Sequence, residues 1–166
     1  MCVGKGITGG YLAMAATAAS ARVYEAFLGP DLSERTLYHG HSYGGNALAA
    51  AVALRHLQLV DEWDVLANVR ARSEQLAAAL ADRVAKLDEV RAVRVKGLMC
   101  AIELASPDDD PLWARRTCSA MVRRGVLARS LGDAVVLVPP LTTTAEEVER
   151  VVATLAEAIP EGCAAL

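Results

Sequence analysis

Apolar side chains recur at spacings of three and four along several stretches of the chain, which is the period of an amphipathic helix. The first stretch is alanine-rich and runs from Asn46 to Val60, and the second follows the polar break at Asp61-Glu62. The second stretch predicts one continuous buried stripe, formed by Leu66, Val69, Ser73, Leu76, Leu80, Val84 and Leu87.

Two further helices are expected in the second half of the chain. One runs from about Leu112 to Arg124, after an acidic loop at residues 107–111, and Gly125 is the residue type favoured just past a helix end. The last helix begins at Thr143 or Thr144, each with a glutamate three positions later as in a capping box, and is expected to end before Pro160. Its buried positions are Val148, Val151, Val152, Leu155 and Ile159.

Short apolar runs between these helices predict strands. Val93 and Val95 alternate with a polar residue, and Met99 to Leu104 form a second run after Lys96-Gly97. A hairpin is expected where 126–129 and 134–138 flank a turn. The order helix, helix, strands, helix, hairpin, helix predicts an α+β fold with helices layered on a small, largely antiparallel sheet.

Composition limits the class of protein. A chain of 166 residues, 54% hydrophobic and 22% charged, suits one globular domain rather than a disordered tail. The 17 basic and 20 acidic residues give a formal charge of −3, which does not suggest a nucleic-acid binder. No apolar run is long enough for a membrane span, and the start lacks a secretory signal. The four cysteines form no close-spaced framework, so a cytoplasmic location is expected.

The first 46 residues sustain no period and are rich in glycine, which indicates backbone that approaches another group closely. Residues 4–9 formally match the G-x-G-x-x-G dinucleotide motif, but only three residues precede them and no acidic residue lies at the expected distance, so this match is weak. Lys5 lies between two glycines, which leaves room for a ring attached to its amine. The alternative is a solvated loop lysine.

A second glycine-rich segment, residues 38–46, leads into the alanine-rich helix. Such a turn aims backbone N–H groups at an anion such as phosphate, and the Ser42 hydroxyl can add a donor. The alternative is a capped turn with Ser42 or Asn46 as the helix cap. His39 and His41 show no metal-ligand spacing with the cysteines, so no metal site is expected.

Arg129 stands near the end of an otherwise apolar run. A guanidinium in such a place needs a partner, and its fork of N–H groups matches a carboxylate. The partner is either Asp133 of the same chain or the carboxylate of a substrate.

In chain order, these segments resemble the fold-type I, class III aminotransferases, which use pyridoxal 5'-phosphate (PLP), and within them the biotin-pathway branch. The resemblance rests on Gly4 to Thr17, on Leu37 to Asn46 and on Leu127 to Leu141. It implies transfer of the amino group of S-adenosylmethionine to 8-amino-7-oxononanoate, which yields 7,8-diaminononanoate. It also implies a homodimer that binds small-molecule substrates.

The resemblance assigns roles to five residues of this chain. Lys5 would bind the cofactor covalently and then move a proton between substrate and cofactor carbons. His41 and Ser42 would contact the cofactor phosphate across the dimer interface, Gly40 would contact substrate, and Arg129 would bind the carboxylate of the acceptor.

The resemblance further implies that residues 1–46 are a remnant of the large cofactor-binding domain, whereas residues 47–166 form linking helices and the C-terminal small α+β domain. In the family a large domain precedes the lysine and carries an aspartate that pairs with the pyridine nitrogen. The chain is therefore expected to be a C-terminal piece that does not transaminate alone and has a missing N-terminal half as a partner. The alternatives are a non-catalytic α+β interaction module or a fragment of another class III aminotransferase.

Overall fold

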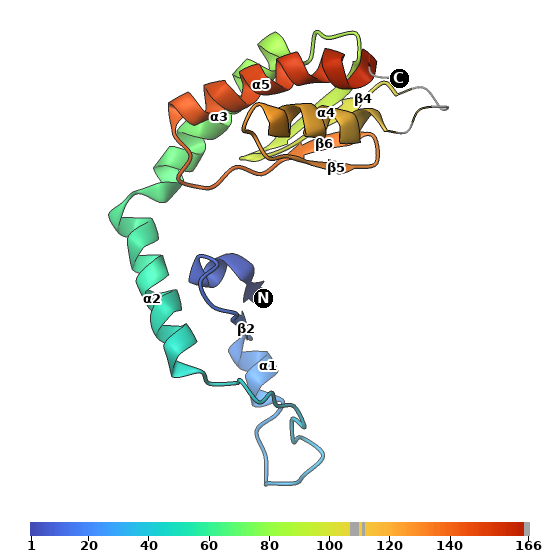
Figure 1. The fold of residues 1–166 in the computed structure, drawn as a ribbon. Coiled ribbons are helices and arrows are strands. Elements are labelled where there is room, and N and C mark those ends of the chain that lie inside the picture. The colour runs from blue at the N-terminus through green and yellow to red at the C-terminus, as the bar shows by residue number, and fades with distance from the viewer. Residues whose placement is uncertain (107–109, 111, 165–166) are drawn as a thin grey trace. The chain divides into compact units, whose positions relative to one another are not determined.

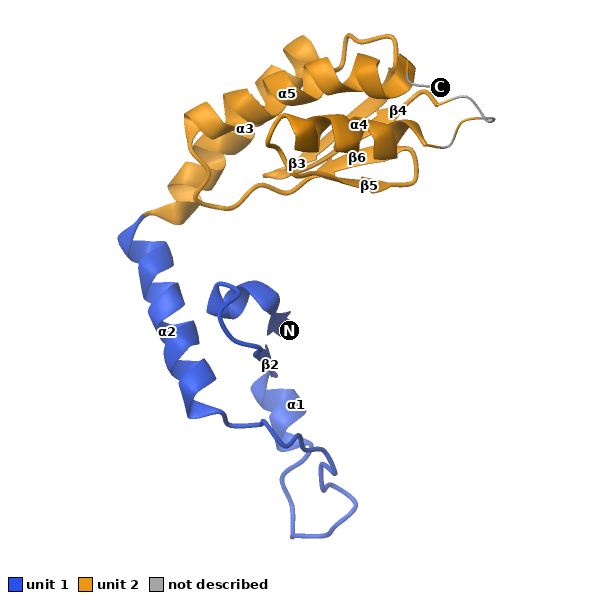
Figure 2. Cartoon of the chain, viewed as in Figure 1, with its two compact units in different colours: residues 1–63 blue, residues 64–166 orange. Residues whose placement is uncertain are grey.

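Two compact units make up the described part of the chain, which in this computed structural model comprises residues 1–106, 110 and 112–164. Figure 2 colours them separately, as an N-terminal unit of residues 1–63 and a C-terminal unit from residue 64 onward. Length and composition predict one globular domain, but the structure has two units. The large apolar core cluster contains only residues of the C-terminal unit, so the first 63 residues do not share it. The family-based boundary at residue 46 stays a prediction.

The N-terminal unit starts with four short elements: β1 (Cys2–Gly4), the 3-10 helix η1 (Lys5–Thr8), β2 (Ala15–Thr17) and α1 (Ala21–Glu25). The strands β1 and β2 pair antiparallel, with Val3 opposite Ala16. Runs of three to five residues are too short to show a period, so the sequence pattern did not predict these elements.

Helix α2 (Ala47–Glu62) completes the N-terminal unit and confirms the predicted alanine-rich helix. Asn46 is its N-cap, since the Asn46 Oδ1 accepts hydrogen bonds from the backbone N–H groups of Leu48 (3.0 Å) and Ala49 (3.3 Å). Ala49 and Ala53, one turn apart, are buried, and η1 packs against this helix.

The C-terminal unit contains α3 (Val65–Arg83), β3 (Val90–Lys96), β4 (Met99–Leu104), α4 (Trp113–Arg123), β5 (Arg129–Leu131), β6 (Ala134–Leu137) and α5 (Ala145–Ala164). This order confirms the predicted α+β class (Figure 1). The four strands form one antiparallel sheet in the order β3-β4-β6-β5.

One face of this sheet is apolar and packs against helices. Cys100, Ile102 and Leu104 alternate along β4 and are buried in the core cluster that α3, α4 and α5 share. On the opposite face, Glu103 pairs with Arg94 at 2.6 Å. The period of two therefore separates a covered apolar face from a polar one.

Within α3, Leu76 and Leu80 of the predicted stripe are buried and Val69 and Ser73 are partly buried. The helix ends at Arg83, so the last two members of the stripe lie beyond it, with Val84 buried and Leu87 partly buried. Leu66 is 56% exposed, whereas its neighbour Val65 is buried. The expectation for Leu66 is wrong, because the buried position in the first turn of the helix is that of Val65 and the core cluster that α3 joins includes Val69 but not Leu66.

Helix α4 ends at a glycine as predicted, and the way it ends shifts the strand that follows. Gly125 has a φ of 78°, its N–H donates to the Val122 carbonyl (2.9 Å), and the Val126 N–H donates to the Met121 carbonyl (3.0 Å). These two bonds are the Schellman motif of a helix C-terminus. Because the Val126 N–H is used there, the strand expected to begin at Val126 begins only at Arg129.

Helix α5 starts with the expected capping box, at Thr144 rather than Thr143. The Thr144 N–H donates to Glu147 Oε2 (2.8 Å), and the Glu147 N–H donates to Thr144 Oγ1 (3.2 Å). Each side chain therefore satisfies a backbone donor that the helix itself leaves free.

The prediction that α5 ends before Pro160 is wrong, since the helix continues to Ala164. A proline removes one helical hydrogen bond. The residues on either side compensate, because Ile159 and Gly162 are buried against the rest of the unit.

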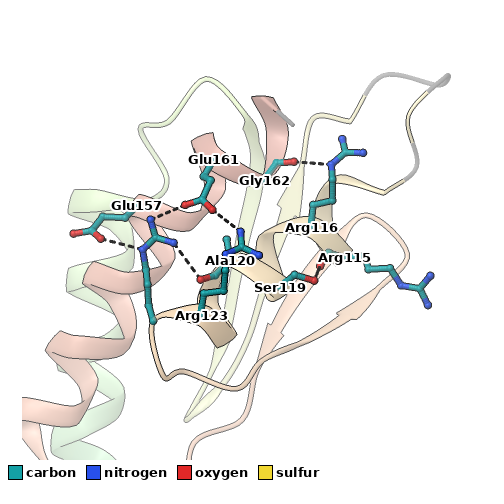
Figure 3. A network of polar contacts seen from close by, with 9 residues as sticks. Arg115, Arg116, Ser119, Ala120, Arg123, Glu157, Glu161 and Gly162 are labelled. Carbon is teal, nitrogen blue, oxygen red and sulfur yellow. Dashed lines mark hydrogen bonds and ion pairs between the residues drawn. The ribbon is translucent and has the colours of Figure 1, made fainter. Parts of the chain in front are cut away.

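Ion pairs join α4 to α5 at the surface (Figure 3). Glu161 accepts from both Arg123 and Arg124, and Arg124 also pairs with Glu157 at 3.3 Å. These side chains are largely exposed, so each pair contributes little to stability by itself.

The acidic loop expected at residues 107–111 lies outside the described residues except for Asp110, which forms an ion pair with Arg116. None of the helices in the described ranges combines the length and apolar character that crossing a membrane requires.

Candidate functional site

Lys5 adopts a backbone conformation that residues with side chains avoid. It follows β1 directly, and its φ of 51° lies in the left-handed region, which costs an L-residue about 1 kcal/mol. A Cβ built on the adjacent Gly6 meets no atom within 4 Å. The lysine side chain is exposed, with open space beside it. Strain of this kind is typical of functional positions.

Local hydrogen bonds close the turn that follows Lys5. Thr8 is fully buried, and its hydroxyl donates to the Leu12 carbonyl. Gly9 has a φ of 60°, and its N–H donates to the Gly6 carbonyl at 3.0 Å. The turn is thus closed by contacts within residues 5–12.

The glycine-rich turn before α2 folds around the imidazole of His41. The Tyr43 N–H donates to His41 Nδ1 (3.1 Å), and the Gly44 N–H donates to the His41 carbonyl (2.9 Å). Because Nδ1 accepts a hydrogen bond, the neutral ring carries its proton on Nε2. That N–H points to no partner within the turn and is suited to an anion. Gly45, with a φ of 71°, leads the chain into α2.

The helix cap that the sequence left open is Asn46, not Ser42. Its side chain already engages the N–H groups of Leu48 and Ala49. The start of α2 is therefore largely satisfied within the chain, and the side-chain donors left for an anion are the Ser42 hydroxyl and His41 Nε2–H.

The N-terminal unit contains an open hollow of about 1310 Å³. The structure thus brings together Lys5, Gly40 and His41, three of the residues that the sequence singles out. Ser42 is exposed and lies outside the wall of the hollow. The wall is formed by Lys5, residues 12–17, residues 39–41, residues 43–46, Ala49 and Ala50.

Met14 and Tyr43 also line the hollow, although the sequence analysis gave them no role. The pairing of Gly4 with Ala15 places the segment of Met14 beside the lysine turn. Strands of three residues show no alternation that could have predicted this pairing.

Arg129 belongs to the C-terminal unit, where it starts β5 opposite Val136 of β6. Its side chain is exposed, and within the described ranges it forms no ion pair with Asp133 or any other carboxylate. The intramolecular pair that the sequence left open is therefore not observed. The guanidinium is accessible to an external carboxylate.

Cys100, which is buried, and Cys163, which is partly buried, do not offer reactive thiols. Burial raises the pKa of the Cys100 thiol to about 11, and burial is also the main cause that raises the pKa of Cys163 to about 11. Both thiols are neutral at pH 7 and are poor nucleophiles and poor metal ligands. Where the chain is described, no three His, Cys, Asp or Glu side chains gather as a metal-binding group.

Comparison with known proteins places this arrangement in a family. The model of the family "Aminotransferase class-III" matches residues 1–159. The chain is 40% identical to an adenosylmethionine-8-amino-7-oxononanoate aminotransferase of Anoxybacillus flavithermus, over 97% of this chain and 37% of the relative. A relative with the same name from Nitratidesulfovibrio vulgaris is 42% identical, over 96% of this chain and 30% of the relative.

Solved structures that resemble this chain are also aminotransferases. The crystal structure of the enzyme of that name from Methanocaldococcus jannaschii matches this chain with a TM-score of 0.89 and 34% sequence identity. The match covers 96% of this chain and 38% of the M. jannaschii chain. An amine transaminase from an uncultivated Pseudomonas species, in its PLP-bound form, has a TM-score of 0.88 at 34% identity, with 98% and 38% covered. The chain thus spans less than two fifths of these proteins, and it belongs to the class III aminotransferase family.

Proposed function

We propose that this chain supplies the catalytic lysine and part of the substrate site of a PLP-dependent aminotransferase that converts 8-amino-7-oxononanoate to 7,8-diaminononanoate, with S-adenosylmethionine as amino donor. The observation that carries the proposal is the strained, glycine-flanked Lys5 in the wall of the hollow. The names of the relatives support the substrate assignment.

The residues present fit PLP. The Lys5 amine suits the cofactor aldehyde, and the absence of a side chain at Gly6 leaves room for the ring. The Ser42 hydroxyl and His41 Nε2–H suit its phosphate. The resemblance implies that these two residues serve the cofactor of a second copy in a homodimer. Ser42 lies outside the hollow that Lys5 lines, whereas His41 lies in its wall.

When bound, PLP supplies an electron sink for the pair left on the substrate carbon after deprotonation. Lys5 Nζ would hold the cofactor and would carry the proton that the substrate carbon gives up. Arg129 would bind the carboxylate of the acceptor through its guanidinium. Gly40 has no Cβ and leaves space for the substrate: a Cβ built there meets nothing within 4 Å.

Full transamination is proposed for this chain only together with the parts of the relatives that it does not match, since it covers 37% of the first relative. The isolated chain is expected to bind the cofactor aldehyde without turning over substrate. A second candidate function is a non-catalytic interaction module. It is favoured by large exposed apolar side chains of the N-terminal unit, such as Tyr11 at 85% and Tyr38 at 78% exposure.

Trapping with borohydride tests the proposal. The chain is incubated with PLP, reduced, digested and mapped by peptide mass spectrometry, with Lys86 and Lys96 as internal references. We expect several-fold more adduct on Lys5 than on either reference, because Lys5 lines this hollow and the two references do not. The variant Lys5→Arg should remove the selective adduct and leave the two references unchanged. Equal labelling of the three lysines would refute a cofactor site in this chain and favour the interaction module.

A further inference from the structure

We propose that His56 of α2 is a positioning residue, which clamps the lysine turn and thereby sets where the Lys5 amine lies. The inference rests on the proposed function, because it concerns the same lysine. His56 is half-buried in the middle of α2, ten residues beyond Asn46.

The clamp is the contact between the His56 ring and Gly9, the residue that ends η1. A Cβ built on Gly9 would lie 2.9 Å from His56 Nδ1 and 3.3 Å from Cε1. The imidazole therefore packs over the face of Gly9 that any side chain would occupy. Residue 9 must be glycine for two separate reasons, its φ of 60° and this ring.

Other residues on the same face of α2 extend this contact. Ala49, Ala53 and His56 follow one another at spacings of four and three, so they share one side of the helix. Both alanines are buried, and Thr8 of η1 is fully buried as well. Their small side chains let η1 approach the helix, and His56 holds its far end.

Helix α2 contacts both turns that the proposed function uses. Asn46 at its start follows the turn that contains His41, and His56 packs on the turn that contains Lys5. Ten residues of α-helix span about 15 Å. A rigid helix of that length fixes the spacing, within one copy, between the lysine turn and the turn proposed to serve the cofactor of the second copy.

The lysine turn needs such support. The backbone hydrogen bonds after η1 are local, such as Tyr11 N–H to the Thr8 carbonyl at 3.2 Å. Lys5 itself is strained, and strained residues persist only where their surroundings hold them. Loss of the His56 ring should therefore let Lys5 relax and leave the wall of the hollow.

Two glycines allow a matched experiment. Gly9→Ala places a methyl group in a left-handed position and against the His56 ring, whereas Gly10→Ala places one at a φ of 85°, where a Cβ meets nothing within 4 Å. Each variant is compared with its counterpart in a His56→Ala background, which isolates the ring contact from backbone strain. Removal of the ring should lessen the effect of Gly9→Ala and leave that of Gly10→Ala unchanged.

Two readouts are made on each variant of the full chain: the ratio of Lys5 to Lys86 adduct after PLP and borohydride, and hydrogen exchange of the Gly9 and Tyr11 amides. We expect His56→Ala to lower the ratio about fivefold or more and to speed exchange at both amides. The variant His56→Asn, whose planar polar group can lie over Gly9, should restore most of both. A uniform loss of structure would not be rescued in this way.

The two proposals fail separately. In one outcome, all lysines of the unmodified chain are labelled equally, while His56→Ala still speeds hydrogen exchange at Gly9. This outcome would overturn the cofactor role of Lys5, and with it the effect of His56 on that role. Selective labelling of Lys5 that persists in His56→Ala, or exchange that does not change, would overturn the clamp and leave the cofactor proposal intact. An effect of Gly9→Ala that stays the same in the His56→Ala background would also overturn the clamp.

Discussion

Gly162 shows how one missing methyl group lets two helices pack. It lies in α5 against α4, and a Cβ built there would lie 2.5 Å from the Thr117 backbone N and 2.7 Å from its Cα. Alanine has the better helix propensity, by about 1 kcal/mol, but the clash involves backbone that cannot rotate away. We expect Gly162→Ala to lower the free energy of unfolding by about 2 kcal/mol, measured by urea denaturation.

A second substitution distinguishes backbone from side-chain crowding at this contact. Thr117 Oγ1 also lies 2.5 Å from the Gly162 Cβ position. If the hydroxyl were the obstacle, Thr117→Ala would rescue Gly162→Ala. We expect no rescue, since the Thr117 N and Cα remain, and a rescued double variant would contradict the backbone explanation.

Arg129 is the opposite case, a charged residue whose removal should leave the fold unchanged. It is exposed and, within the described residues, forms no ion pair. We expect Arg129→Ala to change the free energy of unfolding by no more than about 0.5 kcal/mol. Arg116→Ala is the comparison, because it loses the Asp110 ion pair and a 2.9 Å hydrogen bond to the Gly162 carbonyl. A loss with Arg129→Ala as large as with Arg116→Ala would indicate a structural role for Arg129.

At the scale of elements, the capping box of α5 makes stability depend on pH. Glu147 accepts the Thr144 N–H, and this backbone bond is the main cause that holds the pKa of its carboxyl below the ordinary value. At low pH the unfolded chain takes up this proton more readily than the folded chain does, so the contribution of Glu147 is present at neutral pH and is lost as the pH falls through the lowered pKa. We expect Glu147→Gln to lower the free energy of unfolding at pH 7. The difference in this free energy between the variant and the unmodified chain should shrink as the pH falls.

The neighbouring Glu146 provides a matched control, because it lies in the same first turn without the bonds of the capping box. Thermal unfolding of both variants from pH 3 to pH 7 gives the comparison. A Glu147→Gln difference that stays constant with pH, or one no larger than that of Glu146→Gln, would show that the cap bond is not the cause.

Elements could be predicted where one local rule acts alone. The apolar run of β4, the glycine after α4 and the capping box of α5 each left a clear signal in the sequence. The errors arise where packing or helix-end geometry overrides the local rule. Helix α5 continues through Pro160 because the neighbouring residues are buried. Strand β5 begins only at Arg129 because the Val126 N–H donates to the Schellman motif of α4.

At the scale of the whole molecule, the candidate site was predicted by residue type but not by arrangement. Lys5 and the turn with His41 stand out in the sequence because glycines surround them. Their meeting in one hollow depends on β1 pairing with β2 and on η1 packing against α2, which are contacts between segments too short to carry a pattern. The role of Ser42 and the domain boundary at residue 46 stay predictions.

The two units should also differ in how readily they open. The core cluster lies entirely in the C-terminal unit, whereas the buried residues of the described N-terminal unit are Thr8, Ala49 and Ala53. Local opening is governed by buried apolar contact, so residues 1–63 should open at a much smaller free energy than the rest. We expect brief trypsin digestion under native conditions to cut first after Arg22, Arg35 or Arg55 and to leave a protected fragment that begins at His56. Mass spectrometry identifies the fragments, and early cuts within α3 or the four-stranded sheet would show that the apolar core does not set the order of opening.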